Sequence, residues 1–204
     1  MQTITTKTPH WIEITCETLG SGGVVLHPTS TAYGLAVDAT STKGADKLNR
    51  ICNRTAKPYI VLVNGIEMAR QYGEVNDMAK KLIKKYWPGP LTLVLKKINP
   101  AINPVRFDSP FVALRHDNHE VTLALAQAYP VPYTSTSANP SGGPTPYNIK
   151  EALDQFKTGD IDLIIDGGDL PRTLTSTIVD CTGEQLVITR EGAIPTLDIT
   201  QLAI

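Results

Sequence analysis

Short hydrogen-bonding side chains crowd into residues 135–146, which read STSANPSGGPTP. The glycines and prolines of this segment exclude the interior of a helix or a strand. We interpret it as a loop that leaves the end of a strand, the place where ligands bind in open α/β folds. Ser137 and Asn139 would offer short, rigid hydrogen-bonding groups there. A tight surface turn without a ligand explains the same composition equally well.

Hydroxyl groups and cations form two further clusters upstream. Residues 27–35, HPTSTAYGL, place Thr31 among hydroxyls that can bind a small polar substrate without adding charge. An ordinary turn at a strand exit is the alternative. Arg50, Arg54 and Lys57 lie in a stretch without acidic residues, which suits a polyanion such as a nucleoside triphosphate. The same cations would also complement the dipole at the C-terminus of a helix.

Two arginines stand at the ends of expected strands. Arg115 follows three apolar residues in VALR, and a guanidinium on such a rigid element could grip a carboxylate with two hydrogen bonds. A solvated arginine is the alternative. Ser176 opens a later strand and Arg190 leaves another, and either could be purely structural. His116 and His119 lie at an expected strand-to-helix turn, where helix capping around Asp117 and Asn118 is a plainer explanation than metal binding.

Helices and strands that would position these groups are interspersed along the chain. Apolar periodicity and turn residues predict helices at 11–19, 41–51, 77–86, 121–129 and 149–156, and strands at 24–26, 59–63, 91–95, 111–114, 133–136, 163–165, 176–179 and 186–189. Residues 27–33 are expected to form a polar loop. The interspersed order indicates an α/β domain. Because some late strands follow each other without a helix, we expect a mixed sheet.

Composition narrows the classes of function. Of the 204 residues, 41% are hydrophobic and 19% charged, which allows a sizeable core and argues against disorder. The net charge of −1 gives no overall drive toward nucleic acid or an anionic membrane. Three widely spaced cysteines, no secretory signal and no apolar stretch long enough to span a bilayer predict a reduced, cytoplasmic protein without a membrane segment.

Taken in order, these segments resemble the YrdC/Sua5 family, the threonylcarbamoyl-AMP synthases. Seven blocks carry the resemblance: HPTSTAYGLAVD, WPGPLTLVL, VALR, STSANPSGGPTP, DGG, STIVD and REGAIP. The blocks lie between residues 27 and 195, and the resemblance as a whole covers roughly residues 12–195. The resemblance implies an α/β fold with a twisted, open mixed sheet and flanking helices around a large concave cavity. It also implies a single YrdC-like domain over residues 1–204, without the additional C-terminal Sua5 domain.

The resemblance further implies a nucleotidyltransferase. Such an enzyme makes threonylcarbamoyl-AMP and pyrophosphate from L-threonine, bicarbonate and ATP with Mg²⁺, and downstream transfer machinery uses the product for the t6A37 modification of tRNA. The residues that would hold threonine are Thr31, Arg115, Ser137 and Ser176. The residues that would hold ATP are Arg54, Lys57, Asn139, Tyr147 and Arg190. Arg54 and Arg190 would offset charge as pyrophosphate leaves, and neither a protein nucleophile nor a protein metal ligand is implied.

The sequence departs from the family pattern at Leu62, a strand position where some members carry a polar residue near threonine, and at Cys52, which leaves an alternative open. Cys52 stands where the K-x-R motif of the family has lysine, and the stretch after Arg54 is one residue short. Arg50, one turn earlier, is a candidate substitute for that lysine. A non-catalytic or divergent YrdC-like member that binds tRNA or double-stranded RNA is the alternative. It is also suggested by an acid-free run of basic residues, although a solvated helix face is the commoner explanation of such a run: Lys80, Lys81, Lys84, Lys85, Lys96, Lys97 and Arg106.

Overall fold

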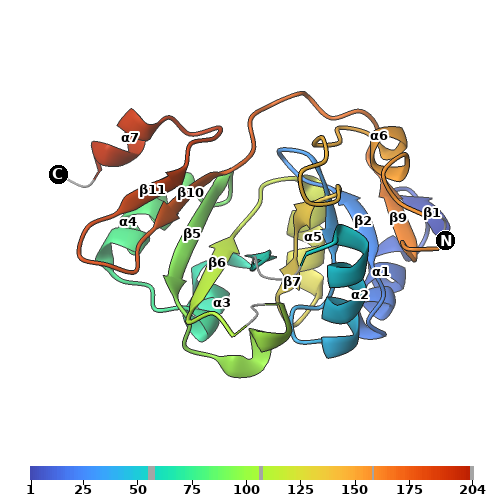
Figure 1. Cartoon of the computed structure of the whole chain (residues 1–204), viewed down its shortest axis with the longest axis horizontal. Helices are drawn as coiled ribbons and strands as arrows, with labels where there is room; N and C mark the ends of the chain where they lie inside the picture. The colour runs from blue at the N-terminus through green and yellow to red at the C-terminus, as the bar shows by residue number, and fades with distance from the viewer. Residues whose placement is uncertain (55–57, 106–107, 158, 203–204) are drawn as a thin grey trace.

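Two mixed β-sheets form the centre of the molecule, and helices cover them (Figure 1). The computed structural model describes residues 1–54, 58–105, 108–157 and 159–202. In spatial order, the first sheet contains β1 (Gln2–Thr5), β9 (Leu163–Asp166), β2 (Val25–Pro28), β3 (Tyr33–Ala36) and β8 (Thr136–Ser137). The strands β1, β9 and β2 are parallel, whereas β3 is antiparallel to both of its neighbours.

The second sheet is also mixed, and at residues 133–137 the chain passes directly from it into the first sheet. In spatial order it contains β11 (Val187–Arg190), β10 (Thr177–Asp180), β5 (Leu91–Lys96), β6 (Phe111–Arg115), β4 (Ile60–Leu62) and β7 (Tyr133–Thr134). Tyr133 pairs with Leu62 in this sheet, and Thr136 pairs with Leu35 in the first sheet. The predicted α/β class with mixed strand directions is therefore confirmed, with the strands divided between two sheets.

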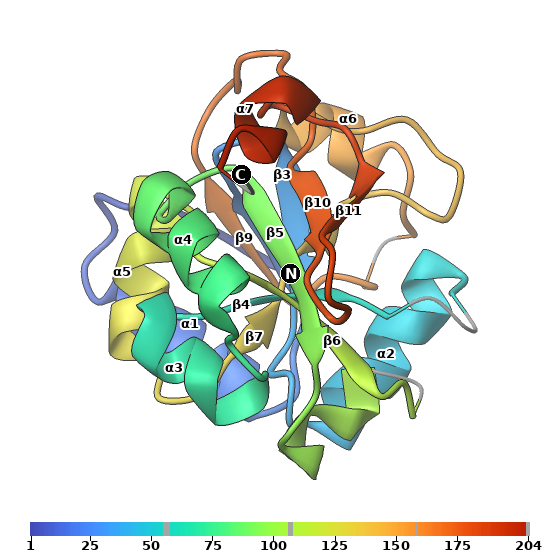
Figure 2. The ribbon, with the colours of Figure 1, turned by 90° about the vertical axis from the view of Figure 1, so that its left-hand side faces the viewer.

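The helices cover the outer faces of the sheets. Two of them, α1 (Trp11–Gly20) and α5 (Glu120–Ala128), contact each other and β2. Figure 2 shows α3 (Gly65–Tyr72) and α4 (Asp77–Tyr86) on the side of β5. The remaining helical elements are α2 (Thr42–Cys52), the 3₁₀ helix at Pro100–Val105, α6 (Ile149–Leu153) and α7 (Thr196–Thr200).

Side-chain caps explain why several helices begin where the sequence predicts. The amide of Gly44 donates to Ser41 Oγ at the start of α2, at 3.1 Å. The amide of Ala79 donates to Asn76 Oδ1 at the start of α4, at 2.9 Å. Each cap satisfies a backbone donor that the first turn of a helix leaves unpaired.

Some elements differ from the prediction. The expected polar loop at 27–33 is wrong at both of its ends, because His27 and Pro28 belong to β2 and Tyr33 begins β3. Every residue of these two strands is buried, so they lack the alternation of apolar and polar residues that reveals a strand with one exposed face. The strand β1 and the helices α3 and α7 were not predicted, and α6 ends at Leu153 rather than at residue 156.

Candidate functional site

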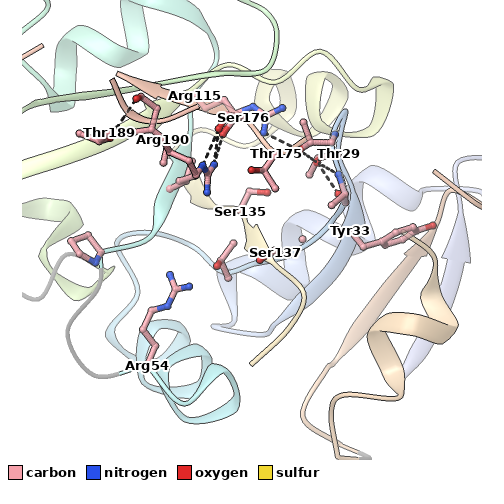
Figure 3. Close-up of a pocket in the computed structure, with 17 residues that line it drawn as sticks. Thr29, Tyr33, Arg54, Arg115, Ser135, Ser137, Thr175, Ser176, Thr189 and Arg190 are labelled. Carbon is pink, nitrogen blue, oxygen red and sulfur yellow. Dashed lines mark hydrogen bonds between the residues drawn. The ribbon is translucent and has the colours of Figure 1, made fainter. Parts of the chain in front are cut away.

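A cavity of about 430 Å³ is lined by residues of both sheets (Figure 3). This volume lies in the range typical of small-molecule sites, about 300–1,000 Å³. Six of the nine predicted site residues line it: Thr31, Arg54, Arg115, Ser137, Ser176 and Arg190. Asn139 and Tyr147 do not line it, and Lys57 lies outside the described residues. Within the described ranges no Asp or Glu lines the cavity, so its charged groups are cations.

Arg115 is fixed at the end of β6 by four of its five N–H groups. Its Nε donates to the carbonyl of Gly89 at 3.1 Å, and Nη1 donates to Thr31 Oγ1 at 3.2 Å. Its Nη2 donates to Ser30 Oγ at 2.7 Å and forms an ion pair with Asp117. Because a guanidinium carries five donors, one Nη1–H remains for a ligand. We expected Arg115 to donate two hydrogen bonds to a carboxylate, but only one N–H is available, next to the Thr31 hydroxyl.

Asp117 lies behind Arg115, and the sequence analysis gave it no role in the site. Its side chain is fully buried and accepts hydrogen bonds from the Ser30 amide and hydroxyl, the His119 amide and the Thr122 hydroxyl, at 2.7–3.1 Å. Burial alone would raise the pKa of Asp117, but the Arg115 charge and these hydrogen bonds hold it below its ordinary value. A carboxylate two residues beyond a strand-end arginine was the available signal, since residues i and i+2 share one side of an extended chain.

Arg190 is the last residue of β11, and it is held against Ser176, which directly precedes β10 in the second sheet. Its Nε and Nη2 donate to the Ser176 carbonyl at 3.0 and 2.8 Å, and Nη2 also donates to Ser176 Oγ at 3.0 Å. Ser176 Oγ lies 2.9 Å from Thr92 Oγ1. Burial, and then the nearby charge of Arg115, lower the pKa of Arg190. An anion bound at Arg190 would stabilise its charged form against both effects.

Arg54 reaches the cavity from just beyond α2, on the side away from Arg190 (Figure 3). Its guanidinium carbon lies 4.7 Å from the ring centroid of Tyr59, and its buried Nε has no hydrogen-bond partner among the described residues. Cys52 is buried and does not line the cavity, and burial raises the pKa of its thiol to about 11. Arg50 lines a separate cavity with Phe156, so the expected substitution of Arg50 for the missing lysine is wrong in this structure.

The two predicted ATP residues outside the cavity are engaged elsewhere. Asn139 Nδ2 donates to the carbonyls of Pro140 and Gly143, both at 2.9 Å, while its buried Oδ1 finds no partner in the described part of the chain. The Tyr147 hydroxyl donates to the carbonyl of Thr173 at 3.0 Å. In this arrangement Asn139 shapes the loop that follows β8, and Tyr147 holds the segment that connects β9 to β10.

Several cavity residues were not predicted individually. They are mostly hydroxyl residues: Thr29, Ser135, Thr175 and Thr189. Each lies within two residues of a predicted site residue, and that proximity in the sequence was the available signal. Such groups can donate or accept hydrogen bonds without adding charge, so they suit the uncharged parts of a polar ligand.

The histidine pair and the lysine run have structural placements. A side chain caps α5 at this turn, but the capping residue is His119 rather than the expected Asp117 or Asn118: His119 Nδ1 accepts from the Val121 amide at 3.2 Å. In the part of the chain that the structure describes, no group of His, Cys, Asp or Glu could hold a metal ion. The lysines of α4 are exposed and do not line the cavity: Lys80, Lys81, Lys84 and Lys85. No helix among the described residues is long and apolar enough to cross a membrane.

One known protein family matches most of the chain. The family model for Sua5, YciO and YrdC proteins, described as telomere recombination, matches residues 17–192. The chain belongs to the Sua5/YciO/YrdC family. The predicted family is thereby confirmed over most of the sequence.

Over the aligned residues, individual members of the family are about one-third identical in sequence to this chain. It is 32% identical over 193 residues to the threonylcarbamoyl-AMP synthase of Pyrococcus abyssi, covering 94% of this chain and 56% of that protein. It is 34% identical over 176 residues to the putative threonylcarbamoyl-AMP synthase of Methanocaldococcus jannaschii, covering 86% and 82%. The chain thus spans little more than half the length of the Pyrococcus relative.

A solved structure confirms the fold. The crystal structure of Pyrococcus abyssi Sua5 complexed with L-threonine is similar to this family member with a TM-score of 0.87 and 31% sequence identity. The similarity covers 98% of this chain and 59% of that one. The backbone architecture described above is therefore that of the family.

Proposed function

We propose that this chain is a threonylcarbamoyl-AMP synthase, which converts L-threonine, bicarbonate and ATP into threonylcarbamoyl-AMP and pyrophosphate. One observation carries the proposal: a single cavity combines a polar pocket around Arg115 and Thr31 with two further arginines, Arg54 and Arg190. An amino acid and a triphosphate can therefore bind side by side. The names of the sequence relatives, and the threonine complex of a structural relative, support the same activity.

The amino acid would bind at the Arg115 end of the cavity. Its carboxylate would take the remaining Nη1–H of Arg115 and the hydroxyl of Thr31, which lies 3.2 Å from that nitrogen. Ser176 and Ser137 would complete the threonine site, in agreement with the roles that the family resemblance implies. Because Arg115 is neutralised by Asp117, this end attracts a carboxylate mainly through oriented hydrogen bonds rather than through net charge.

The reaction needs positioning and charge compensation more than a protein nucleophile. The ammonium group of threonine first loses a proton, and the resulting amine forms an N–C bond with bicarbonate as water leaves, which gives the carbamate. A carbamate oxygen then attacks the α-phosphorus of ATP, and the bond to the leaving pyrophosphate breaks. Arg54 and Arg190 would hold the phosphates and offset the charge that develops on the leaving group. The cavity would accelerate the reaction by holding two anions, the carbamate and ATP, next to each other.

Nucleotide binding would involve further groups and Mg²⁺. Asn139 has a buried Oδ1 without a partner, so a modest rearrangement of its loop would let it bind the nucleotide. Tyr147 and Lys57 are proposed to bind ATP on the family resemblance alone. Since no carboxylate lines the described cavity, Mg²⁺ would be bound chiefly by the phosphates of ATP.

The proposed product places the enzyme in tRNA modification. Threonylcarbamoyl-AMP would pass to the machinery that forms t6A37 in tRNA. This proposal places the reaction in the cytoplasm, and it is supported by the absence of disulfides among three free cysteines: Cys16, Cys52 and Cys181. Direct binding of tRNA or double-stranded RNA stays a prediction that rests on the exposed lysines of α4.

Pyrophosphate release tests the proposal. We expect release that requires L-threonine and bicarbonate together with MgATP, and that falls at least tenfold in Arg190→Gln through loss of a charge-assisted contact. Arg70→Gln is the matched control, because Arg70 lies on α3 and pairs only with exposed Glu67. Release that is indifferent to threonine, or equal losses in both variants, would contradict the proposal.

A further inference from the structure

His27 is a fully buried histidine on β2, directly behind the cavity. Burial lowers the pKa of its imidazole to about 4, although the Pro28 carbonyl and the Asp117 carboxylate oppose this shift. His119 acts in the same direction as burial. The ring is therefore neutral near pH 7, and one of its nitrogens is a hydrogen-bond acceptor. Burying a polar ring costs free energy unless its nitrogens have hydrogen-bond partners. The contact of His27 with Ser135, a residue that lines the cavity, therefore suggests a role for the imidazole there.

The tautomer of His27 follows from its two partners. Its Nδ1 lies 3.1 Å from the Pro28 carbonyl, which can only accept a hydrogen bond, so Nδ1 carries the proton. Its Nε2 is then an acceptor and lies 3.5 Å from Ser135 Oγ. The Ser135 hydroxyl consequently donates its hydrogen toward the imidazole and presents its oxygen lone pairs elsewhere.

Ser135 lines the cavity (Figure 3) and lies between β7 and β8, where the chain passes from one sheet to the other. Its backbone amide donates to the Ile60 carbonyl at 2.9 Å, which fixes the position of the residue. A Cβ atom on Gly34 would lie only 2.8 Å from Ser135 Oγ, so glycine at that position leaves the space the hydroxyl occupies. The backbone hydrogen bond of Ser135 and its contact with His27 thus position the hydroxyl.

Among the described residues, the charged groups that line the cavity provide no hydrogen-bond acceptor for the amino group of an amino acid. Arg54, Arg115 and Arg190 only donate hydrogen bonds, and no carboxylate of the described residues lines the cavity. A bound amino group needs an acceptor, and Ser135 Oγ has its lone pairs free of the imidazole contact. We propose that His27 is a positioning residue that fixes the Ser135 hydroxyl as the acceptor for the amino group of the bound amino acid. This inference rests on the proposed function.

Steady-state kinetics of the full chain test this role. His27→Phe and Ser135→Ala should each raise KM for threonine about fivefold, the effect of losing one neutral hydrogen bond, while KM for ATP stays unchanged. The double variant should be no worse than either single variant, because both remove the same interaction. His27→Gln, which restores an acceptor, should recover most of the loss. Tyr133→Phe is the matched control, since Tyr133 contacts His27 edge-on but its hydroxyl bonds to the Thr122 carbonyl.

Additive effects of the two changes would overturn the proposal, as would equal increases in KM for both substrates. Nitrogen NMR of histidine-labelled protein gives a readout that does not depend on turnover. We expect the Nδ1–H tautomer for His27, and an Nε2 shift on adding L-threonine that disappears in Ser135→Ala. An Nε2–H tautomer overturns the proposal even in an active enzyme. A wild-type protein without threonine-dependent release, but with the expected tautomer, instead contradicts the proposed function.

Discussion

Replacing Asp117 with asparagine should destabilise the protein strongly although the side chain hardly changes size. The carboxylate is fully buried against Arg115, whose side chain is 7% exposed. In the variant the guanidinium stays buried without its counter-ion, near the like charge of Arg190. Removing one partner of a buried ion pair costs about 3–5 kcal/mol of unfolding free energy.

The hydrogen bonds around Asp117 point in the same direction. One carboxylate oxygen accepts from the Ser30 amide, the His119 amide and the Thr122 hydroxyl, and the other accepts from the Ser30 hydroxyl and pairs with Arg115. An amide must place an NH₂ group at one of these two positions, where it would face donors. The variant therefore loses acceptors as well as charge, whichever way the amide is oriented.

Urea denaturation at pH 7 measures this effect. Asp77→Asn is the matched control, because the Asp77 side chain is 93% exposed and pairs only with Lys80 on the helix surface. We expect a large decrease in the urea midpoint for Asp117→Asn and no measurable change for the control. An Asp117→Asn protein within about 1 kcal/mol of wild type would refute the role of the ion pair in fixing Arg115.

Three further predictions follow from the burial and charge of individual groups. Because the pKa of His27 falls from 6.5 to about 4 on folding, stability should decline as the pH drops below 6.5, by about 2 kcal/mol at pH 5. In His27→Phe this share of the decline should vanish in urea titrations, and an unchanged pH profile would contradict it. Arg54→Gln should weaken ATP binding in calorimetry at least tenfold, through loss of a charge-assisted contact, and unchanged affinity would remove Arg54 from the site. Native Cys52 and Cys181, buried with raised pKa values, should resist iodoacetamide until urea unfolds the chain, whereas rapid native labelling would contradict their burial.

The sequence predicted the α/β class because its longer elements have clear boundaries. The helix at Asp77–Tyr86 was predicted at its observed bounds, since Asn76 caps it and a proline-rich turn follows. Strand β3 was missed because it is short and buried on both faces, so polar residues and a glycine near it resembled a loop. The division into two sheets depends on pairings between distant residues, such as Leu35 with Thr136, which one sequence does not contain.

The site was predictable where a residue type alone indicates its chemistry. The cavity brings together Arg54, Arg115 and Arg190, which stood out as cations at expected element ends. Asp117 and His27 were not given roles in the site, because their importance there comes from buried partners far away in the sequence. At the departure from the family motif, the Cys52 side chain packs in the core rather than facing the cavity.

The most direct test of the proposed function is the identity of the product. Purified protein would be incubated with MgATP, L-threonine and ¹³C-bicarbonate, and the mixture analysed by mass spectrometry. The account predicts a threonylcarbamoyl-adenylate that carries one ¹³C atom, appears only when all three substrates are present, and is lost in Arg190→Gln but not in Arg70→Gln. An adenylate without the ¹³C label, or no adenylate despite confirmed binding of ATP and threonine, would contradict it.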